Sequence, residues 1–386
     1  MKIIYLIIFI LFFYLVNILL LDERNKKEHF ENLYSIKKNY KIDPMDYYRC
    51  RIIEDYNHLN CDKKKVLRIA FGSCNSQYKN QEYWQKIMEY DPKLWIWLGD
   101  NIYADYFPKD YSEEKINDII KNSYLDHMEE QYVKQVNDKY YTQFLNSGIE
   151  ITGIWDDHDY FSNNTDYLVD TRNINKAKQL FFDFININKS DRYLEKSAED
   201  NGIYRTYYIK SDNGSNLVKV FLLDTRTFKS GNDILGIKQW RWLKRELINS
   251  NAKLNIIASG IQVMADRDKE DTEAWSSIGN SKMRLMQMLK CIGKNNVIIL
   301  SGDIHKSCIK SNYGFFEITA SPLTNFISKY NYPHKNNIGE YINKNNYGFI
   351  EIHWKDEESD NLEIDKIIIG FNDTIENKSN NVLEIK

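Results

Sequence analysis

Short apolar runs that stop abruptly at polar residues recur along the chain from Val66 onward. A continuous apolar run of this length is typical of a strand that is buried on both faces of a sheet. The runs occupy residues 67–71, 94–98, 149–155, 218–223, 254–258 and 297–300. Each is followed at once by glycine, serine or aspartate. In layered α/β domains the carboxyl ends of the strands share one rim, and ligands bind there.

Segments whose apolar residues recur at helical spacing lie between these strands. They occupy residues 81–90, 112–145, 171–187, 237–249 and 281–292. Alternating strands and helices predict a layered α/β domain. Three later runs, at 315–319, 348–354 and 365–371, are expected to be further strands that close a second sheet.

The composition argues against two broad classes of protein. With 28 Tyr, 18 Phe and 8 Trp among 386 residues, the chain is far richer in aromatic residues than a disordered protein. Its formal net charge is -3 and its lysines are scattered rather than clustered, which argues against nucleic acid as a main partner.

An apolar run near the N-terminus, residues 3–21, is interrupted only by Asn17. As a helix it would be about 28 Å long, close to the roughly 30 Å hydrocarbon thickness of a bilayer. Residues 1–21 therefore fit either a signal peptide or an uncleaved signal anchor. Both predict entry into the secretory pathway, with the protein membrane-anchored or secreted, outside the cytosol. An uncleaved segment would hold the protein on the membrane.

The remainder of the chain is expected to form one domain with short flanks. We predict a charged linker over 22–65, the folded domain over 66–372 and a C-terminal tail over 373–386. Within the linker, Cys50 and Cys61 can form a disulfide in an oxidising compartment or stay as two free thiols.

Residues that can bind metal ions follow several of the predicted strands. Asp100 and Tyr103 lie three residues apart on one loop, and Asp303 and His305 lie two apart on another. Cys74 follows the first strand. Hard cations prefer oxygen ligands, whereas trivalent iron also accepts thiolate and phenolate. This mixed set of ligands suits iron or zinc beside one or more oxygen-bound cations.

Three carboxylates surround His158 in the segment 155–159, directly after a predicted strand. They repel one another unless cations hold them. Bound metal ions polarise phosphoryl oxygens and lower the pKa of bound water, so such a site suits the hydrolysis of phosphate esters. Arg226 has two alternative roles here, a bidentate clamp on phosphate or an ion pair with Asp224.

Taken in order, these segments resemble the alkaline phosphatase D (PhoD-type) family of the metallophosphoesterase superfamily. The resemblance spans roughly residues 66–325. The matching stretches are FGSC (71–74), WLGDNIYAD (97–105), WDDHDY (155–160), GIYRTYYI (202–209), LLDTRTF (222–228), GIKQWRWLKREL (236–247), ASGIQV (258–263) and LSGDIHKS (300–307).

The resemblance implies a four-layer α/β/β/α sandwich with two mixed sheets and an enzyme that hydrolyses phosphomonoesters and phosphodiesters. The family uses iron together with calcium, and zinc or another divalent metal is the alternative here. Two departures stand out. Only residues 22–65 replace the family's N-terminal β-rich domain, and the chain after about residue 325 matches no family segment.

The resemblance also implies which residues form the iron site. Cys74, Asp100 and Tyr103 would ligate the iron. Asp100 would bridge to a second metal ion, with Asn101 nearby.

Further roles follow from the superfamily motifs. Asp157 stands in the place of the asparagine in the Gly-Asn-His motif and would ligate metal, as would Asp303 and His305 of the Gly-Asp-x-His block. A metal-bound hydroxide would attack phosphorus while Arg226 helps to hold the phosphoryl oxygens. His158 would protonate the leaving group or bind phosphate.

Three alternatives to a phosphatase of small phosphate esters stay open. One is a phospholipase-type phosphodiesterase that acts on lipid headgroups beside a membrane. The second is a non-catalytic, membrane-tethered ectodomain on the same fold. The third is a hydrolase that uses Cys74 as nucleophile with His158 and an aspartate, which leaves Asp100, Tyr103 and Asp303 unexplained.

Overall fold

A computed structural model of the chain divides it into two units, Met1–Tyr48 and Arg49–Lys386. Every residue that the structure describes belongs to the second unit. The described residues are 50–53, 66–160, 171–185, 202–211, 214–266, 273–327, 336–355 and 363–385. The apolar run at 3–21 and the Cys50–Cys61 pairing lie outside what these residues can show. Within the described ranges, no helix has the length and apolar character needed to cross a bilayer.

The first sheet has seven strands and is mixed. In spatial order they are β1 (Cys50–Ile53), β14 (Ser379–Ile385), β13 (Ile364–Asp373), β12 (Asn346–Trp354), β2 (Val66–Gly72), β3 (Leu94–Leu98) and β4 (Glu150–Ile154). Neighbours β2, β3 and β4 are parallel, and the other pairs are antiparallel.

The second sheet also has seven strands and is mixed. Their order is β11 (Asn337–Ile342), β9 (Ser307–Asn312), β10 (Phe315–Ala320), β8 (Val297–Ser301), β7 (Leu254–Ser259), β6 (Asn216–Leu222) and β5 (Arg205–Lys210). The four strands β10, β8, β7 and β6 are parallel to one another.

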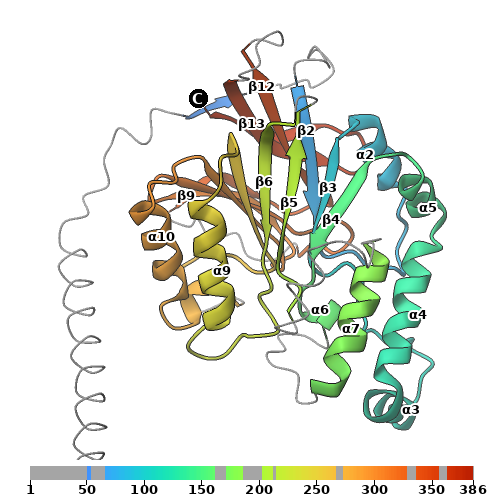
Figure 1. Ribbon diagram of the computed structural model, residues 1–386. Coiled ribbons are helices and arrows are strands. Elements are labelled where there is room, and N and C mark those ends of the chain that lie inside the picture. The colour runs from blue at the N-terminus through green and yellow to red at the C-terminus, as the bar shows by residue number, and fades with distance from the viewer. Residues whose placement is uncertain are drawn as a thin grey trace, which may run out of the picture. The chain divides into compact units, whose positions relative to one another are not determined.

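Helices cover the outer face of each sheet (Figure 1). Beside the first sheet lie α2 (Tyr83–Tyr90), α4 (Tyr124–Val136), α5 (Lys139–Leu145) and α7 (Thr171–Phe184); beside the second lie α9 (Gly236–Ile248) and α10 (Ser281–Cys291). Strand β7 shows how the layers pack. Its residues Ile256 and Ala258 belong to the apolar cluster shared with the first sheet, whereas Ile257 belongs to the cluster under α9 and α10. The predicted α/β/β/α sandwich with two mixed sheets is confirmed.

The segment 112–145, predicted as one helix, is divided. It forms α3 (Glu113–Asp118), a π-helical turn (Ile119–Ser123), α4 and α5. The break before α5 has a local cause, because the Asp138 carboxylate accepts hydrogen bonds from the backbone N–H groups of Tyr140 and Tyr141 at 2.9 and 3.0 Å. An aspartate at that position starts a new helix.

Strands near the C-terminus depart from the sequence expectation. Only β10 joins the second sheet; β12 and β13 join the first, because β12 pairs with β2 and sets Ile350 opposite Ile69. The expected tail over 373–386 contains β14, which pairs with both β13 and β1 and buries Val382 and Leu383. Residues from both expected flanks therefore extend the first sheet.

The role of β14 can be tested by Leu383→Ala. Removal of a buried leucine side chain leaves a cavity, so we expect the free energy of unfolding to fall by about 2–5 kcal/mol in urea denaturation. Lys378→Ala, an exposed position just before the strand, is the matched control and should change it by less than about 0.5 kcal/mol. Equal stability of the two variants would show that this segment does not belong to the folded domain.

Candidate metal centre

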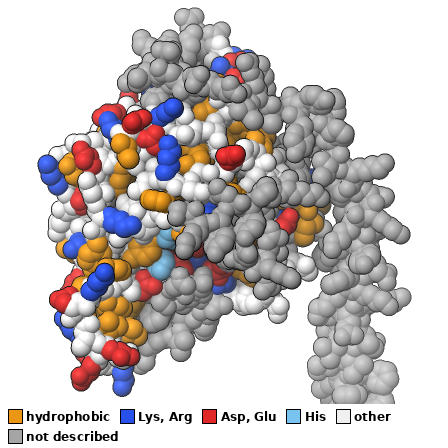
Figure 2. Space-filling model, turned by 180° about the vertical axis from the view of Figure 1, so that it is seen from behind, with side chains coloured by type: hydrophobic (Ala, Val, Ile, Leu, Met, Phe, Trp, Pro, Cys, Tyr) orange, Lys and Arg blue, Asp and Glu red, His pale blue; other side chains and the backbone are white. Residues whose placement is uncertain are grey.

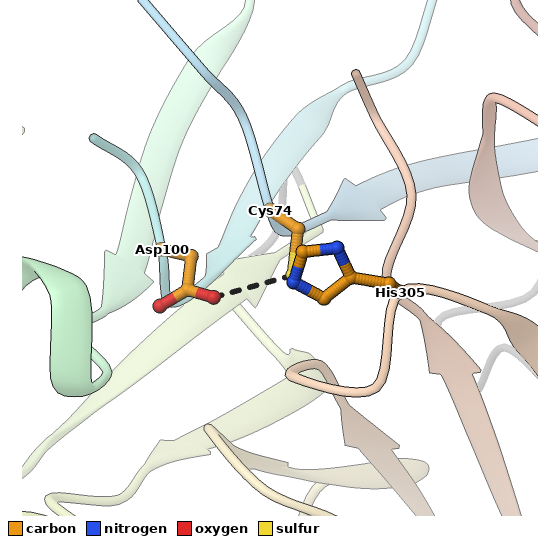
Figure 3. A group of neighbouring side chains, drawn as sticks. All are labelled: Cys74, Asp100 and His305. Atoms are coloured by element: carbon orange, nitrogen blue, oxygen red, sulfur yellow. Dashed lines mark hydrogen bonds between the residues drawn. The ribbon is translucent and has the colours of Figure 1, made fainter. Parts of the chain in front are cut away.

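Side chains from separate strand ends meet where the two sheets adjoin. The Cys74 thiol, just after β2, donates to Asp100 Oδ2, just after β3, over 3.2 Å. His305, which follows β8, points toward the same pair (Figure 3). Its Nε2 atom lies 3.3 Å from the hydroxyl of Tyr103. The predicted iron ligands Cys74, Asp100 and Tyr103 thus lie together, with His305 among them.

Three overlapping groups of potential ligands lie at this junction. Within each group, one ligand atom per residue lies within 4.8 Å of the others. The groups are Cys74, Asp100 and His305; Asp100, Asp157 and His158; and Asp156, Asp157 and Asp303. Because Asp100 belongs to the first two groups and Asp157 to the last two, neighbouring cations could share a carboxylate.

The backbone is left-handed at four of the predicted ligands. The φ angles are 56° at Cys74, 48° at Asp100, 73° at Asp303 and 54° at His305. Residues other than glycine avoid this region, at a cost of about 1–3 kcal/mol each, and such residues cluster at functional sites. Sharp turns directly after the strands aim these four side chains at one point.

Glycines let the strand ends approach one another. A Cβ atom on Gly99, where φ is +93°, would lie 2.4 Å from the Cβ of Asp156, and one on Gly260 would lie 2.3 Å from Asp156 Oδ1. Neither distance is possible for real atoms. The loops after β3 and β7 therefore enclose the Asp156 side chain only because both positions lack a side chain.

Burial and like charge make the carboxylates of this junction hard to ionise. Burial raises the pKa of Asp100 and of Asp303 well above the ordinary value, and neighbouring aspartates raise both further. Asp100 Oδ1, Asn101 Oδ1 and Asp303 Oδ2 are buried atoms with no hydrogen-bond partner among the described residues. Buried oxygens of this kind are normally satisfied. Bound cations would give such oxygens partners and relieve the repulsion between the carboxylates, so the residues fit a metal centre.

The Arg226 side chain pairs with two acids that the sequence did not single out for it. Its fully buried guanidinium binds Asp156 through Nε at 2.6 Å and Nη2 at 2.8 Å, and Nη1 lies 2.5 Å from Glu273. Asp224 instead accepts the backbone N–H of Arg226. The two-point contact with Asp156 holds a positive charge directly behind Asp157, whose Oδ1 lies 3.7 Å from Nη2.

The pKa values of the two histidines of the site are shifted in opposite directions. Burial disfavours the charged form of His158, but its hydrogen bond to Asp105, 2.7 Å from Nδ1, and the charge of Asp157 outweigh this and raise its pKa. Burial and the proximity of His158 lower the pKa of His305 to about 4. At neutral pH His305 is therefore uncharged, as a metal ligand must be.

A network of buried amide side chains positions the loop of Tyr103. Gln77 binds both backbone groups of Tyr103, donating to its carbonyl at 3.1 Å and accepting from its N–H at 3.0 Å. Gln131 on α4 accepts from Gln77 in turn at 3.0 Å. Asn75 ties the same two loops together by donating to the Asn101 carbonyl at 3.2 Å.

Sequence reasoning missed three of these contributors: Gln77, Asp105 and Asp156. Asp105 lies in the segment 97–105 that carries the family resemblance, and its spacing to His158 gives no sign of the contact. Asp156 is one of three acids in the segment 155–159, where the family resemblance marks only Asp157 as a ligand. No feature of the sequence marks Gln77, because its partner is the backbone of another loop.

Known proteins resemble this chain in sequence over most of its length. A family model described as PhoD-like phosphatase matches residues 69–358. Alkaline phosphatase D of Bacillus subtilis (strain 168) is 24% identical over 300 residues, which cover 67% of this chain and 49% of that protein. The chain thus spans about half the length of this curated relative.

Two solved structures share the fold. A structure described as PhoD has a TM-score of 0.56 at 17% identity, and the match covers 83% of this chain and 72% of that one. The purple acid phosphatase PPD1 from yellow lupin (Lupinus luteus) seeds has a TM-score of 0.53 at 9% identity, covering 83% and 54%. At these identities the likeness concerns the fold alone.

The electrostatics of the centre predict how pH and metal act on stability. Burial raises the pKa of Asp159 from 3.8 to about 7, and Asp100, Asp156 and Asp303 are also raised. A carboxyl with a raised pKa stabilises the fold while protonated, and this contribution is lost as pH rises through the folded value. We therefore expect the Tm of chelator-treated protein to fall between about pH 4 and 7.

Calorimetry of the same protein after metal addition completes this test. Cations should raise the Tm more at pH 7.5 than at pH 5, because only ionised carboxylates attract them. A Tm that is insensitive both to pH in this range and to added metal would contradict a cation-binding centre.

The two hydrogen bonds of Gln77 to the backbone of Tyr103, which we call the Gln77 clamp, give a separate prediction. Gln77→Ala frees the backbone of Tyr103, so we expect metal affinity to fall by about 10–100-fold, the usual effect of losing a group that orients a ligand. Gln143→Ala, at an exposed position on α5, is the matched control. Titration of metal into chelator-treated protein measures both, and equal affinities would show that Gln77 does not position the ligand.

Proposed function

The chain belongs to the PhoD-like phosphatase family, and from this premise we propose that it is a metal-dependent phosphoric ester hydrolase acting on phosphomonoesters and phosphodiesters. The observation that carries the proposal is the convergence of two overlapping groups of potential ligands that share Asp100. One consists of Cys74, Asp100 and His305, and the other of Asp100, Asp157 and His158. Substrates of this class are small anions, whose charge suits a cation-lined site.

We propose that the cations are iron and calcium. Cys74, Tyr103 and His305 offer sulfur, phenolate oxygen and imidazole nitrogen, which suit trivalent iron, with Asp100 shared. Asp157, Asn101 and Asp303 offer only oxygens, which suit calcium. Zinc or another divalent ion is the alternative. Such ions polarise phosphoryl oxygens and lower the pKa of bound water when present.

His158 is suited to protonate the leaving group. The Nδ1 atom of His158 is hydrogen-bonded to Asp105, which holds the ring in one orientation. Nε2 is then the nitrogen that can donate a proton. The hydrogen bond to Asp105 and the charge of Asp157 raise the pKa of His158, which favours the protonated ring that such a role needs. Contact with the ring of Tyr103, at 4.3 Å between centroids, fixes the imidazole from the side.

Arg226 acts, on this proposal, as a positioning residue. Its guanidinium is engaged by Asp156 and Glu273, so it supports the site by neutralising Asp156 rather than by gripping phosphate. The negative charges of Asp157 and Asp303 can then attract cations.

Two rival functions receive less support from the residues. A cysteine nucleophile needs an accessible thiolate, whereas Cys74 is fully buried and burial raises its pKa to about 11. A non-catalytic ectodomain gives no reason for four left-handed ligand positions. A phospholipase-type activity stays compatible with the site.

We propose that residues 1–21 direct the chain into the secretory pathway, as a membrane anchor or as a cleaved signal peptide.

Removal of single ligand charges tests the proposal. Asp100→Asn and Asp303→Asn each keep the side-chain shape but withdraw a charge that holds cations, so we expect turnover of a chromogenic phosphate ester to fall by more than about 100-fold. Metal analysis should show loss of bound ions, with circular dichroism unchanged.

Asp110→Asn, the same substitution at an exposed position, should retain full turnover and metal. Full activity of both ligand variants would sink the proposed function. Turnover of a monoester, a nucleotide diester and a lysophospholipid by the parent protein then assigns the ester class.

A further inference from the structure

Apolar side chains are exposed beside the metal centre. Tyr78, Tyr106, Phe326 and Ile327 expose 37%, 44%, 50% and 45% of their surface. They are four of the nine large apolar side chains exposed among the described residues, and all four belong to segments that adjoin the proposed ligands. We call these four residues the apolar rim. Exposed apolar groups gathered at one place usually mark a binding surface.

Tyr78 and Tyr106 lie on the two loops that carry Cys74 and Tyr103. The backbone N–H of Tyr106 donates to the carbonyl of Tyr103 at 3.3 Å, and Tyr78 directly follows the Gln77 clamp. Their rings are 4.9 Å apart at an interplanar angle of 45°. The two rings therefore contact each other at a tilt, on the loops next to the proposed ligand Tyr103.

Phe326 and Ile327 belong to a segment whose backbone is hydrogen-bonded to His305. The backbone N–H of Ile327 donates to the His305 carbonyl at 3.1 Å. Lys79 donates to the carbonyl of Thr324 at 2.9 Å, which ties this segment to the loop of Tyr78. Figure 2 shows hydrophobic side chains gathered beside a histidine, with acidic side chains next to it.

Two contacts hold the Tyr78 ring in place. The Tyr78 hydroxyl donates to Gln131 at 2.6 Å, and the ammonium of Lys134 lies 4.4 Å from the centre of the Tyr78 ring. A fixed aromatic surface favours a flat partner, because stacking then costs little side-chain entropy. A flexible alkyl chain gains no comparable benefit from fixed ring planes.

We propose that the apolar rim binds the alcohol portion of the substrate and selects phosphate esters of flat aromatic alcohols, such as aryl or nucleoside esters. This inference rests on the proposed function, since the phosphoryl group must sit at the metal centre. With the phosphoryl group there, we place the alcohol portion against the rim, because Tyr106 and Ile327 are bonded through their backbones to Tyr103 and His305. Aromatic side chains that stack on a ring or base are a common device for such recognition.

Non-hydrolysable phosphonates test the rim without turnover. We would titrate methylphosphonate, benzylphosphonate and hexylphosphonate into the metal-loaded full chain by calorimetry. The expected result is that benzylphosphonate binds about tenfold more tightly than methylphosphonate and more tightly than hexylphosphonate. Tyr106→Ala should remove most of this preference while leaving methylphosphonate affinity unchanged.

Two control variants separate the ring from general effects. Tyr106→Phe keeps the ring and should keep the preference for benzylphosphonate. Ile375→Ala removes an exposed apolar side chain outside the rim and should leave all three affinities unchanged.

The remaining outcomes are decisive. If methylphosphonate binds and benzylphosphonate binds no better, or if Tyr106→Ala keeps the preference, the rim proposal is overturned while the proposed function stands. If hexylphosphonate binds most tightly and Phe326→Ala abolishes that gain, the rim selects aliphatic alcohols and the aromatic proposal is again overturned. If none of the three binds, the rim and the proposed function fail together.

Discussion

Repulsion among carboxylates at the junction of the two sheets is the constraint on which the site depends. Asp100, Asp156, Asp157 and Asp159 are buried there, and Asp303 lies beside them partly buried. Ionised together in a medium of low dielectric constant, they would destabilise the fold by several kcal/mol. The fold tolerates them because each has a distinct source of compensation: a guanidinium, backbone N–H groups, or the cations that the unsatisfied oxygens of Asp100 and Asp303 can hold.

The rigidity of the surrounding layers allows such a site to exist. Strands buried on both faces, such as β3 and β7, cannot shift to relax a strained turn at their ends. The left-handed conformations of Cys74, Asp100 and His305 therefore persist. The amide network around Gln77 extends this rigidity into the loops, which would otherwise be the most mobile part of a strand-end site.

Local patterns in the sequence were enough to predict the layers and the converging strand ends, because a run such as 94–98 followed by Gly99 and Asp100 contains its own signal. Contacts that join distant segments could not be predicted. Arg226 meets Asp156 across 70 positions, and β12 is inserted beside β2 although a far longer segment separates them. The roles of Asp156 and Asp159 after β4 could not be predicted for the same reason, since their partners come from elsewhere in the chain.

Those partners also explain why we propose only one of the three acids after β4, Asp157, as a metal ligand. Asp156 gives both oxygens to Arg226. Asp159 accepts hydrogen bonds from the backbone N–H groups of Asn101, Ile102 and Asp156, so it holds two strand-end loops together. Asp157 lies farther from Arg226 than Asp156 does, at 3.7 Å, and it belongs to two of the three groups of potential ligands. On the proposed function, Asp156 and Asp159 therefore build the frame of the site, and Asp157 is the acid of the three that takes part in binding cations.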